Sequence, residues 1–133
     1  MPFMKMVHDV DPRKVIFDKI GMKKGKVQGF HLLRNDVLCG IYERPTQTQS
    51  KVFIPDTVRK EDEHQGKAAL VVAMGPGSFE SDENYTFRAK VQVGDWITLW
   101  VHEGRKIVVN GQLCRIVRDQ DIVARIDEPD SVF

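Results

Sequence analysis

From residue 30 to residue 126, apolar positions come in short blocks or alternate with polar ones. Alternation with a period of two is typical of β-strands, and turn signals separate the blocks. Asn110-Gly111 is the strongest of these signals and predicts a tight hairpin. Many short strands at this spacing predict an all-β domain, a small irregular antiparallel β-barrel rather than a sandwich of long strands. The predicted strand segments are HLLRNDVLCGIYERP, KAALVVAM, VGDWITLWV, KIVV, QLCRIV and DIVARI.

A helical period precedes this region. Val15, Ile16 and Ile20 recur at helical spacing, Asp11 with the proline after it is a good helix start, and Gly21 is a plausible stop. Such a short helix is marginal alone and must dock on something. The following MKKGKVQG reads as a basic, glycine-punctuated linker whose charges are solvated.

Size and composition indicate one ordinary globular domain. The chain has 133 residues, of which 41% are hydrophobic and 29% charged, with a formal net charge of +1. This balance gives no general attraction for nucleic acid or for an anionic membrane. No apolar run approaches the ~20 residues that a membrane span needs, and the first ten residues lack the features of a secretion signal. We therefore expect a protein that is made and assembled in a cytosol.

Groups that could carry catalysis do not form a recognisable constellation. The four histidines are scattered without metal-ligand spacing, and no nucleophile elbow or phosphate-binding loop is present. Cys39 and Cys114 lie in apolar strand segments, where cysteine usually acts as a small hydrophobe, and a disulfide is disfavoured. Trp96 and Trp100 are four apart, which in a strand places both on one face, for core packing or a subunit interface. The sequence predicts no enzyme, no cofactor and no metal site.

The stretch SKVFIPDT contains an apolar triplet, Val52, Phe53 and Ile54, between polar segments. A buried core strand is one interpretation of the triplet. The other is an exposed hook that binds a partner, and the polar flanks together with Pro55 favour it.

Four motifs then follow one another in a fixed order: VFIPDT, QGKAALVVAMGPGS, VQVGDWITLW and EGRKIVVNGQLCRIVRDQDIVARI. From about Phe30 to Ile126 the chain resembles the GroES-like co-chaperonin family. The resemblance implies a small irregular β-barrel at residues 30–126 with two excursions, a loop at 45–66 that carries the apolar tripeptide and a hairpin region at 75–89. In that family the tripeptide docks between apical helices of a chaperonin, and seven subunits close a lid over a folding chamber.

The chain also departs from the family pattern. Ser50 and Lys51 stand where the family has two glycines, which predicts a stiffer loop. An N-terminal arm, residues 1–29 with the short helix and linker, precedes the barrel, and a C-terminal tail, 127–133, follows it. These departures look similar to divergent, bacteriophage-encoded members of the family.

Two functions follow, and both suit a homo-oligomer that binds proteins. The favoured hypothesis is a virion structural protein, a capsid decoration or cement protein assembled in the bacterial host cytoplasm, with the phage major capsid protein or another virion protein as partner. The alternative is a co-chaperonin in the host cytoplasm that binds chaperonin apical domains and caps a GroEL-type ring. The predicted partner-binding residues are the loop residues Val52, Phe53, Ile54 and Pro55 and the helix residues Val15, Ile16, Phe17 and Ile20.

Overall fold

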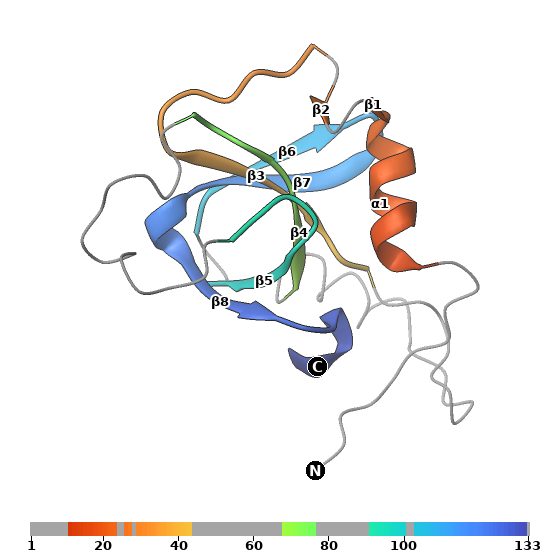
Figure 1. Cartoon of the computed structure of the whole chain (residues 1–133), viewed down its shortest axis with the longest axis vertical. Helices are drawn as coiled ribbons and strands as arrows, with labels where there is room; N and C mark the ends of the chain where they lie inside the picture. Colours follow the sequence, from red (N-terminus) through yellow and green to blue (C-terminus); the bar gives the residue numbers. More distant parts are fainter. Residues whose placement is uncertain are drawn as a thin grey trace.

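The described part of the chain forms a six-stranded antiparallel sheet with one short α-helix packed on it (Figure 1). This computed structural model describes residues 11–23, 26–27, 29–43, 68–76, 91–100 and 103–132. The prediction of a small all-β fold with a short N-terminal helix is confirmed. The elements are α1 (Pro12–Ile20), β1 (Met22–Lys23), β2 (Lys26–Val27), β3 (Asp36–Ile41), β4 (Ala69–Met74), β5 (Trp96–Leu99), β6 (Arg105–Val109), β7 (Gln112–Arg118), η2 (Asp119–Asp121), β8 (Ile122–Ile126) and η3 (Pro129–Val132).

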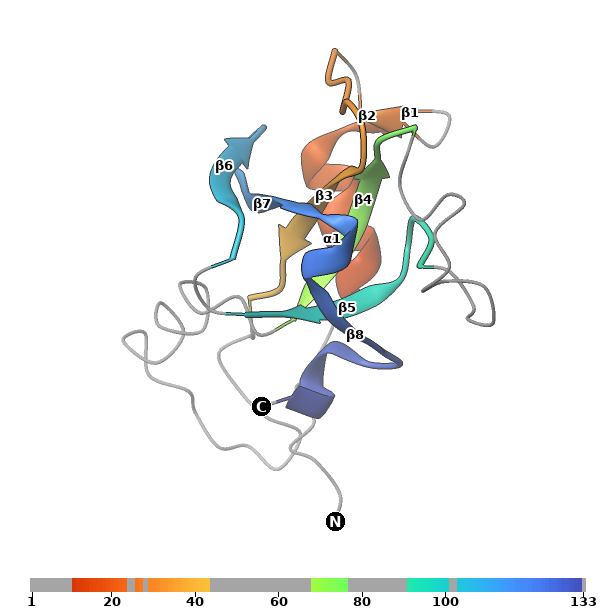
Figure 2. The ribbon, with the colours of Figure 1, turned by 90° about the vertical axis from the view of Figure 1, so that its left-hand side faces the viewer.

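The strand order in the main sheet is β6-β7-β3-β4-β5-β8. The sheet bends strongly, so that β5 and β8 run across the direction of β3 and β4 (Figure 2). Among the described strands, β6 and β8 are the two edges and do not pair with each other. The hairpin predicted at Asn110-Gly111 joins β6 to β7, with Val109 opposite Gln112. Both turn residues have positive φ, 50° and 82°, the geometry that favours Asn-Gly in a two-residue hairpin turn.

Helix α1 begins and ends where the sequence predicts. The Asp11 side chain accepts a hydrogen bond from the backbone N–H of Arg13 at 2.9 Å, and Pro12 occupies the first turn. Gly21 closes the helix in the left-handed conformation, with φ of 80°. Within the described residues no helix is both long and apolar enough to span a membrane.

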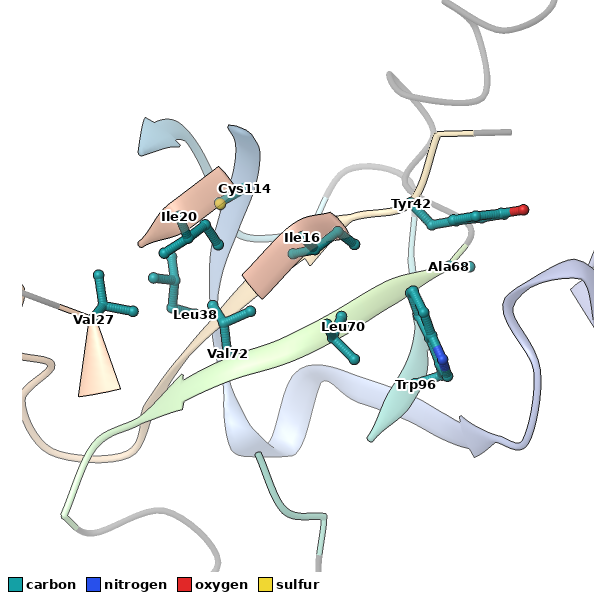
Figure 3. Packing of buried hydrophobic residues seen from close by; sticks show 10 residues of the cluster. All are labelled: Ile16, Ile20, Val27, Leu38, Tyr42, Ala68, Leu70, Val72, Trp96 and Cys114. Carbon is teal, nitrogen blue, oxygen red and sulfur yellow. The ribbon is translucent and has the colours of Figure 1, made fainter. Parts of the chain in front are cut away.

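Apolar side chains cover both faces of the sheet because its strands alternate between them. One face lies beneath α1, and Figure 3 shows the cluster there, with Leu38 of β3, Leu70 of β4 and Trp96 of β5. The opposite face forms a second cluster that includes Val37 and Ile97. The helix is thus one layer of the core and not a projecting arm.

The stretch between the helix and the main sheet, predicted as a linker, contains a short β-ladder. Met22 pairs with Val27 across a small antiparallel ladder, β1–β2. Val27 is buried in the cluster beneath α1, beside β4. Strands of two residues are too short to leave a period in the sequence, so the pattern could not reveal them.

The two tryptophans differ in burial, so they do not form a shared core face. Trp96 is buried, whereas Trp100 is 65% exposed. Strand β5 ends at Leu99, and its pairing with β8 shifts register between Thr98 and Leu99. Trp100 follows the end of the strand, so the alternation on which the prediction rested does not reach it.

Candidate partner-binding site

The predicted tripeptide, Val52 to Ile54, and Pro55 lie outside the described residues. So do Ser50 and Lys51, and the hairpin region beyond residue 76. The residues that flank the segment 44–67 are described. Tyr42 and Glu43 precede it, and Ala68 follows it.

We call Tyr42 and Ala68 the stem of the segment 44–67. The backbone N–H of Tyr42 donates to the carbonyl oxygen of Ala68 at 3.0 Å. This bond extends the ladder between β3 and β4, in which Ile41 lies opposite Ala69. The chain therefore leaves the sheet and returns to it at one point, on two adjacent strands.

Aromatic packing and a buried hydrogen bond fix the stem. Tyr42 is 2% exposed, and its ring meets Trp96 edge to face, with centroids 5.6 Å apart. Figure 3 shows the Tyr42 ring beside Ala68, with its hydroxyl oxygen directed away from the apolar cluster. That hydroxyl donates to Oδ1 of Asp130 at 2.5 Å. A buried charge-assisted bond of this kind is stronger than a bond between neutral groups.

The helix residues predicted to dock on a partner lie mostly inside the subunit. Ile16 and Ile20 are 4% and 0% exposed, and Phe17 packs against the same cluster. Ile16 sits directly over Gly40 of β3, where an added Cβ would lie 2.7 Å from its Cγ2. The prediction is wrong for Ile16 and Ile20, because these side chains cover the subunit's own sheet. Val15 alone of the four is exposed, at 48%.

A side chain of the β6–β7 turn holds the C-terminal end of α1. Nδ2 of Asn110 donates to the carbonyl oxygen of Ile20 at 2.5 Å. The bond satisfies one of the carbonyls that a helix end leaves without an intrahelical partner. The positive φ of Asn110 therefore serves both the hairpin and the position of the helix.

Cys39 and Cys114 are free and fully buried, as the sequence predicts for small core residues. In the β3–β7 ladder Cys39 lies opposite Arg115 and Cys114 opposite Gly40, so the two thiols point to opposite faces of the sheet. Burial raises the pKa of Cys39 far above its usual range and raises the pKa of Cys114 to about 11. Both thiols stay protonated near neutral pH, which makes them poor nucleophiles.

The sequence reasoning missed a buried arginine. Arg115 is 1% exposed and donates from Nη1 to the carbonyl oxygens of Trp100 at 3.1 Å and Glu103 at 3.5 Å. Burial lowers the pKa of its guanidinium. The signal was present, because Arg115 falls on the face of β7 whose other members are Leu113 and Val117. Its role is structural, since it fixes the backbone between β5 and β6.

Reactive groups do not converge in the described part of the chain, where no group of three or more His, Cys, Asp or Glu could hold a metal ion. The described fold is a compact β-domain in which Tyr42 and Ala68 bring the two ends of the segment 44–67 together. Family comparison agrees with this fold. The family model described as Chaperonin 10 Kd subunit matches residues 29–126, and the chain belongs to this family.

Curated relatives carry the name Co-chaperonin GroES. The protein of Gemmatimonas aurantiaca is 35% identical over 95 residues, which cover 71% of this chain and 92% of that protein. The protein of Caulobacter sp. strain K31 is 33% identical over 98 residues, covering 74% and 97%. The protein of Methylobacillus flagellatus is 30% identical over 95 residues, covering 71% and 94%.

These relatives overturn the favoured hypothesis from the sequence. The prediction of a virion decoration protein is wrong, because the family and its named members are co-chaperonins. The three relatives come from bacteria, so they lend no support to a bacteriophage origin. The N-terminal helix and the replacement of the two glycines suggested a capsid role because they differ from the family pattern. The helix has another explanation, since it packs within the subunit.

Proposed function

We propose that this protein is a co-chaperonin that caps a GroEL-type chaperonin ring and assists protein folding, without enzymatic activity of its own. The observation that carries the proposal is the match to the Chaperonin 10 Kd subunit family over residues 29–126, which spans the whole described sheet. The relatives' shared name, Co-chaperonin GroES, supports the same function.

In this proposal the docking element is the tripeptide Val52, Phe53 and Ile54, with Pro55 after it. The stem supports this assignment, because Tyr42 and Ala68 hold both ends of the segment 44–67 at one point of the sheet. Apolar side chains carried on such a segment can enter a groove between helices of a partner. The partner is the apical domain of a chaperonin subunit.

Simple energetics require several copies of the tripeptide. Each apolar side chain contributes about 1.5–3 kcal/mol on full burial, while ordering the backbone costs about 1–2 kcal/mol per residue. A single segment therefore binds weakly. A ring of identical subunits overcomes this through effective concentration, so we propose a homo-oligomer acting in the cytoplasm of a bacterial cell.

The proposal divides the chain into three parts. Residues 30–126 are the GroES-like domain, which presents the docking segment. Residues 1–29 and 127–133 are extensions to it, and α1 and η3 are their described elements. The extensions serve the domain itself, since Ile16 and Asp130 are both buried against it.

Phe53→Asp tests the proposal. A charge cannot enter an apolar groove without a large desolvation cost, so the variant is expected to lose detectable binding to a GroEL-type ring and to abolish assisted refolding. The measurement is co-sedimentation with the ring in the presence of ATP, together with recovery of activity of a denatured client enzyme.

Val108→Asp is the matched control. Val108 is 63% exposed on the edge strand β6, so the same charge is introduced at an exposed apolar position outside the tripeptide. This variant should bind and assist refolding as the wild type does. Wild-type protein that never binds a chaperonin ring, or Phe53→Asp protein that binds normally, contradicts the proposal.

A further inference from the structure

The last described residues of the chain pack onto the stem, although they lie beyond the family match. The family model ends at residue 126, and η3 (Pro129–Val132) follows it and packs beside β5. Asp130 is 5% exposed. A carboxylate is rarely buried without a partner, and Oδ1 of Asp130 accepts the hydrogen bond from the Tyr42 hydroxyl.

Tyr42 links this contact to both ends of the segment 44–67. Only Glu43 separates it from the start of the segment, and its N–H donates to the carbonyl oxygen of Ala68, which follows the segment. Its ring packs on Trp96 of β5, the strand beside which η3 lies. One residue, Tyr42, thus connects the C-terminal extension to β5 through its side chain and to Ala68 through its backbone.

We infer that the C-terminal extension is a brace that fixes the stem, with Asp130 and Tyr42 as positioning residues for the docking segment. Holding Tyr42 sets the direction in which the chain leaves the sheet. A fixed starting direction lowers the conformational entropy that the segment loses on binding, and preorganisation of this kind raises affinity. The effect on affinity rests on the proposed function, whereas the brace itself does not.

Amide hydrogen exchange tests the brace directly. The variants are Tyr42→Phe, which removes only the hydroxyl, and Asp130→Ala, which removes the acceptor. Loss of a buried hydrogen bond to a charged group should accelerate exchange of the Tyr42 amide about tenfold or more. Asp130→Asn keeps an acceptor oxygen and should restore part of the protection.

Asp127→Ala is the matched control, because Asp127 is an exposed carboxylate in the same extension. In this variant the Tyr42 amide should exchange at the wild-type rate. The brace is overturned if Tyr42→Phe and Asp130→Ala both leave this amide protected as in the wild type, or if Asp127→Ala accelerates exchange as much as they do.

Binding to a GroEL-type ring then tests the positioning role. Tyr42→Phe and Asp130→Ala should weaken affinity at least about tenfold per ring. Val117→Ala lowers global stability from a buried position in the other cluster and should leave affinity within about twofold. Equal weakening by Val117→Ala overturns the positioning role. Absence of wild-type binding overturns the proposed function instead, and the exchange data still decide the brace.

Discussion

Helix α1 rests on the sheet through a contact that a pair of alanine substitutions can test. Ile16 is 4% exposed and lies over Gly40, where a Cβ would approach its Cγ2 to 2.7 Å. Heavy atoms so close cannot coexist, so Gly40→Ala must displace the Ile16 side chain or the helix that carries it. Overpacking of this kind costs about 1–3 kcal/mol, from which the lower chain entropy of alanine recovers about 0.4–1 kcal/mol.

The complementary change, Ile16→Ala, should lower the free energy of unfolding by about 2–5 kcal/mol, because it opens a cavity beneath the helix. In the double variant the new Cβ at position 40 enters this cavity, since the clashing Cγ2 is gone. The other neighbours of that Cβ, Gln112 Cγ and Ile20 Cδ1, lie at 3.8 Å, which is ordinary contact. The double variant should therefore be more stable than the sum of the single effects predicts, by about 1–3 kcal/mol.

Urea unfolding followed by far-ultraviolet circular dichroism measures these values, at one fixed protein concentration because an assembly couples stability to concentration. Val15→Ala is the control. It makes the same kind of change at a half-exposed position of α1 and should alter stability by less than about 1 kcal/mol. Additivity of the two single effects within about 0.5 kcal/mol would refute the packing of Ile16 on Gly40.

Two further predictions concern the helix end and the thiols. Asn110→Gly removes the hydrogen bond to Ile20 and should lower the free energy of unfolding by about 1 kcal/mol. Asn110→Ala should lower it by about 1–2 kcal/mol more, because alanine also disfavours the positive φ at this position. Equal losses in the two variants would contradict a contribution from the backbone conformation. Because the pKa of Cys114 rises from 9.0 to about 11, the unfolded chain releases that proton first as pH rises, so the free energy of unfolding should fall between about pH 9 and 11. Urea unfolding across that range gives the free energy of unfolding as a function of pH. In Cys114→Ala its slope should be shallower than in the wild type by up to about 1.4 kcal/mol per pH unit, and an unchanged slope would contradict the prediction.

Local signals in the sequence predicted the local structure well. The caps Asp11 and Gly21 bound α1, and Asn110-Gly111 joins β6 to β7, because each depends on residues close in the chain. Turn and cap chemistry of this kind is encoded within a few positions.

Features that depend on distant residues were missed or misread. The apolar face of α1 was interpreted as a surface for another protein, because a helical period shows that a face is buried but not what covers it. The cover is the subunit's own sheet, at β3, β4 and β7, which come later in the chain. The burial of Asp130 against Tyr42 likewise joins positions 88 apart, and no spacing in the sequence relates them. The fold as a whole was predicted from the order of the motifs that resemble the family, and not from any single spacing.

The strand order has a consequence for how the chain reaches its native state. Strand β3 is central, yet one of its neighbours is β7, with Asp36 opposite Arg118. The outer strand β8 ends at Ile126, and Asp130 follows it onto the stem. During synthesis the apolar residues of β3 therefore stay exposed until β7 has been made, because their packing partners come late in the chain. The subunit is expected to fold late, as one unit of high contact order, and to expose aggregation-prone surface until its last strand is made.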